Sequence, residues 1–124
     1  MQLRQVAHLL DCDVLSGQDR LDREMNRGFA ADLMSDVLRF APQGALLITG
    51  LSSAQSIQTA EIADMGAVLL VSNKRPADDA LAIARGRNLP LLLTAHGMFE
   101  ACGLLFRQGF GAPLTTEYSS RATE

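Results

Sequence analysis

Residues 44–55 read Gly44-Ala45-Leu46-Leu47-Ile48-Thr49-Gly50-Leu51-Ser52-Ser53-Ala54-Gln55. A short apolar run that stops at glycine and is followed by helix-capping residues is typical of a buried parallel strand that leads into a helix. We expect Ser52 to cap this helix with Gln55 completing a capping box, and Gly66 to cap its C-terminus. Because ligands bind at the carboxyl ends of strands in open α/β sheets, this strand end is a candidate ligand site.

The same strand-to-helix unit occurs twice more along the chain. The apolar run 67–71 leads into Ser72-Asn73-Lys74-Arg75, and Pro76 is expected at the first position of the next helix. Residues 91–94 form the last expected strand, and a final helix is expected over 98–106. Alternating strands and helices predict a single α/β domain with a mainly parallel sheet flanked by helices.

The N-terminal third is less regular. Helical spacing predicts a short amphipathic helix over 2–10, followed by a brief strand at Val14-Leu15. The charged segment 18–26 suits a hairpin-like excursion or an edge strand. Residues 28–31 are then expected as a strand, with Asp32 capping the helix that follows.

Length and composition restrict the class of protein. The chain of 124 residues has the size of one domain, with 48% hydrophobic residues as in globular proteins. A net charge of −3, scattered basic residues, one Tyr and no Trp predict no nucleic-acid partner. We expect no membrane partner and a cytoplasmic location, because long apolar runs and a secretory leader are both missing from the sequence. Residues 1–110 are expected to form the domain, and 111–124 a flexible C-terminal tail.

The cysteines and histidines are few and far apart. We interpret Cys12 and Cys102 as two reduced, partly buried thiols, with a disulfide or a redox pair as the alternative. With His8 and His96 as the only histidines, a structural zinc site would lack ligands, so no metal site is predicted. The sequence does not identify a cofactor.

No catalytic motif is found in the sequence. A Walker loop, a dinucleotide-binding glycine motif, a nucleophile elbow and a His-Glu-x-x-His helix are all missing, which favours a protein that is not an enzyme. Asp11 and Asp13 could suggest the acidic pocket of a response-regulator receiver. They follow a helical pattern instead of a buried strand, and His96 stands after the last strand where a receiver needs Lys. We interpret the two acids as surface turn residues.

Polar residues gather at the three predicted strand ends, which together we call the strand-end rim. Lys74 and Arg75 precede a helix N-terminus, where backbone N–H groups and the helix dipole attract anions; an ordinary exposed turn is the alternative. His96 could contact an anion or transfer a proton, or simply be solvated. The candidate ligand-binding residues are Thr49, Gly50, Ser52, Ser53, Ser72, Asn73, Lys74, Arg75, Thr94 and His96.

The order of these segments resembles the DRTGG domain. The resemblance covers about residues 1 to 108 and rests on Asn26-Arg27-Gly28-Phe29-Ala30-Ala31-Asp32-Leu33-Met34-Ser35-Asp36-Val37-Leu38, on Gly44 to Thr49, and on the later units with Pro76 and Phe99-Glu100. It is also similar to the N-terminal domain of HPr kinase/phosphorylase and to the middle region of long phosphotransacetylases. The chain departs from the family pattern at polar positions, since Ser72-Asn73-Lys74 stands where a Thr-Gly-Gly turn is expected.

The resemblance implies a regulatory, non-catalytic domain. Stand-alone members resemble small proteins found beside iron-only hydrogenase and related redox genes, and dimerisation is plausible for such a domain. We therefore predict a homodimer that senses a small anionic or nucleotide ligand, or docks to a redox or metabolic enzyme. The alternative is an interaction scaffold without a ligand, which exposed apolar residues on the helix of Met34 or of Phe99 would favour. An enzyme would need a nucleophile beside His96.

Overall fold

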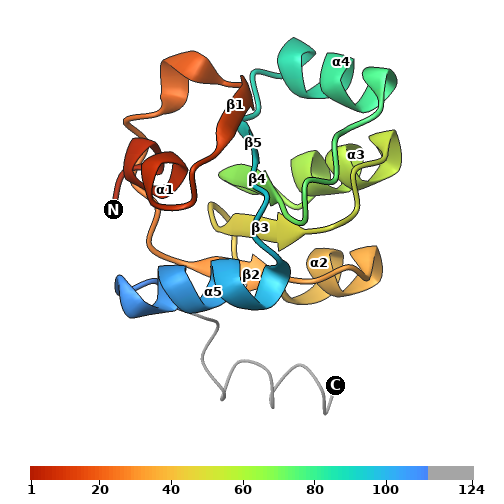
Figure 1. The fold of residues 1–124 in the computed structure, drawn as a ribbon. Coiled ribbons are helices and arrows are strands. Elements are labelled where there is room, and N and C mark those ends of the chain that lie inside the picture. Colours follow the sequence, from red (N-terminus) through yellow and green to blue (C-terminus); the bar gives the residue numbers. More distant parts are fainter. Residues whose placement is uncertain (112–124) are drawn as a thin grey trace.

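The computed structural model describes residues 1–111, in which helices cover both faces of a five-stranded sheet (Figure 1). The α/β prediction is confirmed. In chain order the elements are α1 (Leu3–Leu9), β1 (Asp13–Ser16), a 3₁₀ turn (Gln18–Arg20), β2 (Gly28–Ala30), α2 (Met34–Phe40), β3 (Leu46–Thr49), α3 (Ala54–Ile62), β4 (Ala67–Leu70), α4 (Asp78–Gly86), β5 (Leu91–Leu93) and α5 (Met98–Arg107).

The strands lie in the order β1-β5-β4-β3-β2. Strands β2 to β5 are parallel, whereas β1 runs antiparallel to β5 and pairs Asp13 with Leu93 and Ser16 with Leu91. The carboxyl ends of the four parallel strands therefore meet at one end of the sheet, as the alternation of strands and helices predicts. The predicted strand at Val14-Leu15 is confirmed as β1, although the local pattern does not indicate that it pairs antiparallel with β5.

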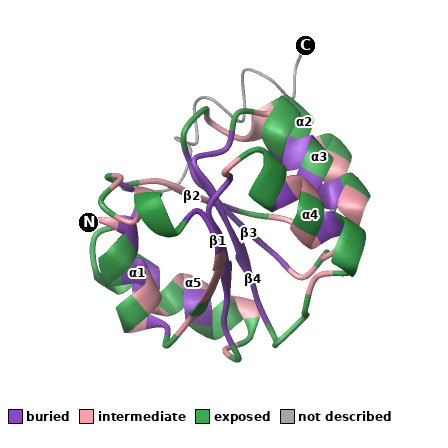
Figure 2. Cartoon of the chain, turned by 90° about the horizontal axis from the view of Figure 1, so that it is seen from above, coloured by how far each residue is buried: buried purple, intermediate pink, exposed green. Residues whose placement is uncertain are grey.

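Two apolar cores lie on the two faces of the sheet. Helices α2, α3 and α4 cover one face, and α1 and α5 cover the other (Figures 1 and 2). Along β3, Leu47 belongs to the first core while Leu46 and Ile48 belong to the second, because successive side chains of a strand point to opposite faces. Burial on both faces explains why the central strands are continuous apolar runs.

The predicted helix starts are wrong by one or two residues. Ser53, not Ser52, caps α3, because its extended backbone lets its Oγ accept the Ser56 N–H at 3.2 Å. Gln55 therefore does not form the predicted capping box. Helix α4 begins at Asp78 after the extended residue Ala77, so Pro76 lies before the helix and not at its first position.

Gly66 has a different role from the predicted cap. Helix α3 ends at Ile62 with Ala63 as its C-cap, and Asp64 takes the left-handed conformation, with a φ of 58°. A Cβ on Gly66 would lie 2.5 Å from the carbonyl oxygen of Gly44. Gly66 is thus required because two backbone segments approach each other closely.

The charged segment 18–26 forms neither the predicted hairpin nor an edge strand. Gly17 adopts a φ of 75° against Pro90, which turns the chain into the 3₁₀ turn. An isolated bridge between Gln2 and Glu24 is the β-pairing of this segment. No helix within residues 1–111 is long and apolar enough to cross a membrane. The predicted tail lies outside the described residues, except for Gly111.

Candidate functional site

Asp32 joins the carboxyl ends of β2 and β3. Its Oδ1 accepts the Thr49 hydroxyl at 2.9 Å and the Gly50 N–H at 2.8 Å. The prediction that Asp32 caps α2 is wrong: Leu33 occupies the N-cap position, and no side chain bonds the first turn there. A long-range hydrogen bond has replaced a local one, which leaves the buried Thr49 hydroxyl and the Gly50 N–H engaged within the protein.

Ser52 and Ser53 lie at the N-terminus of α3. The Ser53 hydroxyl is used as the cap, and the Ser52 carbonyl accepts the Ala77 N–H at 3.4 Å. This contact holds the loop before α4 against the loop before α3. The Ser53 hydroxyl thus serves the start of α3, and the Ser52 carbonyl serves the loop that leads into α4.

The loops after β4 and β5 are joined by backbone hydrogen bonds. Ser72 and Asn73 both adopt left-handed conformations, with φ values of 56° and 54°. Their N–H groups donate to the carbonyls of His96 at 2.8 Å and Thr94 at 2.9 Å. The buried Thr94 hydroxyl donates to the Leu10 carbonyl at 2.7 Å, which ties α1 to the same end of the sheet. Four of the predicted residues are therefore brought together by backbone contacts.

The charged residues of the rim point outward. Arg75 Nη2 lies 3.5 Å from Asp13 Oδ2, and both side chains are about two-thirds exposed. Lys74 is exposed and forms no ion pair with any residue in the described range. The Nδ1 atom of His96 contacts the Glu100 carboxylate one helical turn later. An exposed pair such as Arg75–Asp13 contributes little to stability, so both cations are available to an anion.

One hollow borders the strand-end rim. It has a volume of about 350 Å³ and is lined by Leu10, Asp11, Ala95, His96, Gly97 and Glu100. His96 alone among the ten predicted residues lines it. The structure thus distributes these residues along the whole sheet end, and the hydroxyls of Thr49, Ser53 and Thr94 are already hydrogen-bonded to the protein.

The cysteines are poorly suited to nucleophilic chemistry. Burial, aided by the negative charges of Asp11 and Asp13, raises the pKa of Cys12 to about 12, and burial also raises the pKa of Cys102. Within residues 1–111 both thiols are free, and His, Cys, Asp and Glu side chains form no cluster of three that could hold a metal ion. No hydroxyl or thiol of the described chain hydrogen-bonds to the His96 ring.

An apolar surface on α5 is the feature that the ten predicted residues do not include. Phe99 is 94% exposed and Phe106 72% exposed, and Gly103 lies between them with open space where a side chain would be. Beside Phe106, an apolar recess of about 150 Å³ lies between α5 and β2, lined in part by Ala30, Cys102 and Phe110. The signal in the sequence is the i, i+4, i+7 spacing of these α5 positions, which a helix places on one face.

Comparison with known proteins gives one family. The model of the DRTGG domain matches residues 5–107. No curated protein matches the sequence. A crystal structure of the CBS and DRTGG domains of the regulatory region of Clostridium perfringens pyrophosphatase, complexed with its activator diadenosine tetraphosphate, is similar in fold, with a TM-score of 0.69 and 16% sequence identity. The match covers 84% of this chain and 45% of that one. The chain belongs to the DRTGG domain family.

Proposed function

We propose that this DRTGG domain is a regulatory module without catalytic activity, and that it acts by pairing with a second copy of itself through α5. The observation that carries the proposal is the exposure of Phe99 and Phe106 on one face of one helix. Single exposed apolar residues are common on monomers, but two phenylalanines on one helix face, bordered by an apolar recess, mark an interaction surface.

The α5 face is complementary to itself. If two α5 helices pack antiparallel about a twofold axis near Gly103, Phe99 of one copy faces Phe106 of the other, and Glu100 faces Arg107. Gly103 allows the helix backbones to approach, since nothing lies within 4 Å of a Cβ placed there. A twofold interface needs this kind of self-complementarity. The recess beside Phe106 is of a size that holds a phenyl ring, as cavities of about 150 Å³ accept benzene.

The energies are of the right order for a reversible dimer. Burying one Phe stabilises an interface by roughly 1.5–3 kcal/mol, and a symmetric pair buries four such side chains. The cost of association is about 4–15 kcal/mol, which is similar in size, so we expect a reversible dimer whose population depends on the protein concentration. A regulatory domain can use such a dimer as a switch if a ligand or partner prefers one state.

Sedimentation velocity of the full chain tests the proposal. The parent protein should sediment increasingly as a dimer as its concentration is raised to about 0.5 mM. Phe99→Glu/Phe106→Glu should remain a monomer with an unchanged circular dichroism spectrum. Leu38→Glu on α2 is the matched control, because Leu38 is also exposed, at 55%, but lies in the other helix layer. A dimer that persists in the double variant would exclude α5 pairing. A parent chain that is still monomeric at about 0.5 mM would exclude it as well.

We also propose which kind of enzyme the domain regulates. In the crystallised relative the DRTGG domain is part of an enzyme's regulatory region that holds a nucleotide activator. By this likeness in fold, and by the family resemblance, we propose that the chain acts on a redox or metabolic enzyme. Affinity capture with the parent chain, compared with Phe99→Glu/Phe106→Glu, tests whether an enzyme partner depends on the dimer.

A second candidate function is the binding of a small anion at the strand-end rim. Exposed Lys74 and Arg75, next to the left-handed pair Ser72-Asn73, support it. Thermal-shift measurements with nucleotides, acyl phosphates and inorganic anions test it, with Lys74→Ala/Arg75→Ala as the variant. If no compound raises the melting temperature of the parent more than that of the variant, the rim does not bind these anions.

A further inference from the structure

A polar cavity lies at the end of the sheet opposite the strand-end rim. It has a volume of about 180 Å³, and its polar lining includes Arg20, Arg23, Arg87, Glu61 and Asp64. These residues come from the segment after β1, from the end of α3 with its following turn, and from the residue after α4. The elements that they follow all lead toward the amino ends of the parallel strands. The guanidinium groups of Arg20 and Arg23 therefore border the same space as that of Arg87, which is far from them in the sequence.

The charges in this arginine cavity are only partly balanced. Arg23 is held in place because its Nη1 donates to the Gly66 carbonyl at 2.6 Å. Arg87 Nε lies 3.7 Å from Glu61 Oε1, beyond hydrogen-bonding distance, and Arg20 forms no ion pair within residues 1–111. With three guanidinium groups against two carboxylates, the cavity carries excess positive charge. An anion with several oxygens can accept from Arg20 and Arg87 together, in the geometry that guanidinium groups favour.

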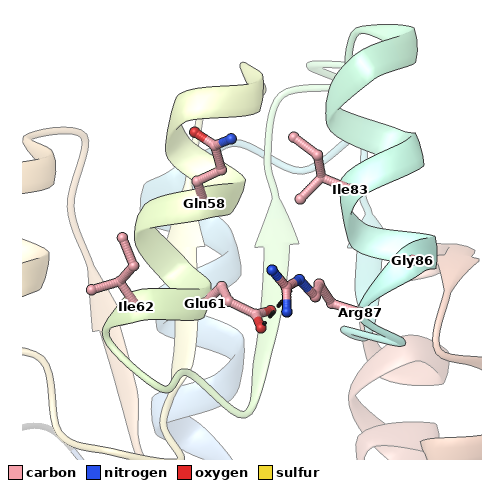
Figure 3. A pocket seen from close by; sticks show the side chains of 6 residues that line it. All are labelled: Gln58, Glu61, Ile62, Ile83, Gly86 and Arg87. Atoms are coloured by element: carbon pink, nitrogen blue, oxygen red, sulfur yellow. Dashed lines mark ion pairs between the residues drawn. The ribbon is translucent and has the colours of Figure 1, made fainter.

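A larger groove adjoins the arginine cavity. It lies between α3 and α4, has a volume of about 430 Å³, and shares Glu61 and Arg87 with the cavity. Figure 3 shows Gln58 and Ile83 on the two sides of this α3–α4 groove, with the Glu61–Arg87 pair at its lower end. Gly86 leaves part of the wall without a side chain. The volume is within the range of about 300–1,000 Å³ that small-molecule sites occupy.

We propose that the arginine cavity and the α3–α4 groove form one binding site for an organic phosphate that carries a planar group. The phosphate lies against Arg20 and Arg87, and the planar group lies against Ile83 and Gly86. The Gln58 amide can both donate to and accept from the N6 and N7 edge of adenine, so an adenine nucleotide is the appropriate probe. This site is separate from α5 and from the rim, and the proposal goes beyond self-association.

Isothermal titration of the full chain with adenosine 5′-monophosphate tests the two halves of the site. Ribose 5-phosphate and adenosine each offer one half of the probe, and each should bind more weakly than the nucleotide. Arg20→Gln and Arg87→Gln should weaken nucleotide binding about tenfold to a hundredfold, as expected for the loss of a hydrogen bond to a charged group. Arg4→Gln, an exposed substitution on α1, is the control that should leave binding unchanged.

A second variant separates binding from folding. Gly86 lies in α4 with no atom within 4 Å of an added Cβ, and leucine is a better helix former than glycine, so Gly86→Leu should fold normally. Its side chain should fill the groove, which removes the advantage of the nucleotide over ribose 5-phosphate. Gly86→Ala adds only a methyl group at the same position and should bind the nucleotide nearly like the parent. The proposal is overturned if the parent does not bind at millimolar nucleotide, if Gly86→Leu and Arg20→Gln bind like the parent, or if Lys74→Ala/Arg75→Ala alone abolishes binding.

Discussion

At the carboxyl end of the sheet, Asp32, Thr49 and Thr94 direct their polar groups at neighbouring parts of the protein, and the loops between them are joined by backbone hydrogen bonds. At the amino end, Arg20 and Arg87 border open cavities, and their guanidinium groups are loosely paired or unpaired within the described chain. The comparison of the two ends shows that polar residues at the end of a strand do not by themselves form a ligand-binding site. A binding site needs hydrogen-bonding or charged groups that have no partner within the protein and that border a cavity.

The largest effect is expected at the amino end, where Gly66 lies close to the backbone of Gly44. Gly66→Ala places a Cβ 2.5 Å from the Gly44 carbonyl oxygen, and backbone atoms cannot move away as a flexible side chain would. We expect a loss of about 3 kcal/mol or more in the free energy of unfolding, measured by urea denaturation. Gly86→Ala, which meets nothing within 4 Å, is the control and should be neutral or stabilising. Equal unfolding midpoints for the two variants would contradict this account.

At the carboxyl end, Asp32 should matter more than its exposed position suggests. Asp32→Ala leaves the buried Thr49 hydroxyl and the Gly50 N–H without their acceptor, which should lower the free energy of unfolding by about 1–3 kcal/mol. Asp32→Asn keeps a neutral acceptor and should lose less. Urea denaturation of both variants measures the difference, and an Asp32→Ala protein as stable as the parent would show that solvent replaces the carboxylate.

Two buried hydroxyls, one at each end of the sheet, differ in their hydrogen bonding. Thr94 Oγ1 donates to the Leu10 carbonyl and accepts the His96 N–H at 3.2 Å, whereas Ser16 Oγ is buried without a hydrogen-bond partner in residues 1–111. Thr94→Val should cost about 1–2 kcal/mol, and Ser16→Ala should be neutral or stabilising by a few tenths of a kcal/mol. The ranking of their melting temperatures checks this, and a reversed order would mean that Ser16 has a partner in solution.

The smallest effect concerns the thiol of Cys12, whose pKa depends in part on the nearby carboxylates of Asp11 and Asp13. With its pKa raised to about 12, first by burial and then by Asp11 and Asp13, the folded thiol stays protonated at pH 8. Its alkylation by iodoacetamide should be at least about a hundredfold slower than in the urea-unfolded chain, as mass spectrometry can follow. Cys102 should react faster than Cys12, because burial alone raises its pKa. Equal rates for the two thiols would contradict the electrostatic difference.

The raised pKa of Cys12 also makes the stability of the fold depend on pH. Above the ordinary thiol value of 9.0, the unfolded chain releases the Cys12 proton while the folded chain keeps it. The unfolded state is then favoured, so this contribution to stability is present below pH 9 and decreases as the pH rises toward 12. Cys12→Ser should reduce that loss at alkaline pH, which urea denaturation at pH 7 and pH 10 would measure.

Local patterns predict the central strands well and the site poorly. The runs at Leu46–Thr49, Ala67–Leu70 and Leu91–Leu93 are recognisable because burial on both faces requires consecutive apolar residues. The sequence around Asp32 predicts a helix cap, because a capping pattern involves only residues within one helical turn. In the structure its hydrogen-bond partners are the distant residues Thr49 and Gly50. Only the fold determines which distant partner competes with the local one.

Local sequence patterns do not predict the arginine cavity, for a similar reason. About half of the chain separates Arg87 from Arg20 and Arg23, and basic residues spread along a sequence look like ordinary solvated positions. Their convergence follows from the antiparallel pairing of β1 with β5, which brings the segment after Ser16 next to the entry into β5. The α5 surface is different, because the spacing of Phe99 and Phe106 is visible in the sequence and only their exposure needed the structure.

Residues just beyond the family match define what could be moved into another protein. The match ends at residue 107, but Phe110 is buried in the core and the Gly111 carbonyl accepts the Gly28 N–H at 2.9 Å. A graft cut at the family boundary would leave the outer edge of β2 bare and remove part of its support, which invites strand exchange between grafts. A transplantable unit, for a fusion or a synthetic sensor, should therefore run at least through Gly111.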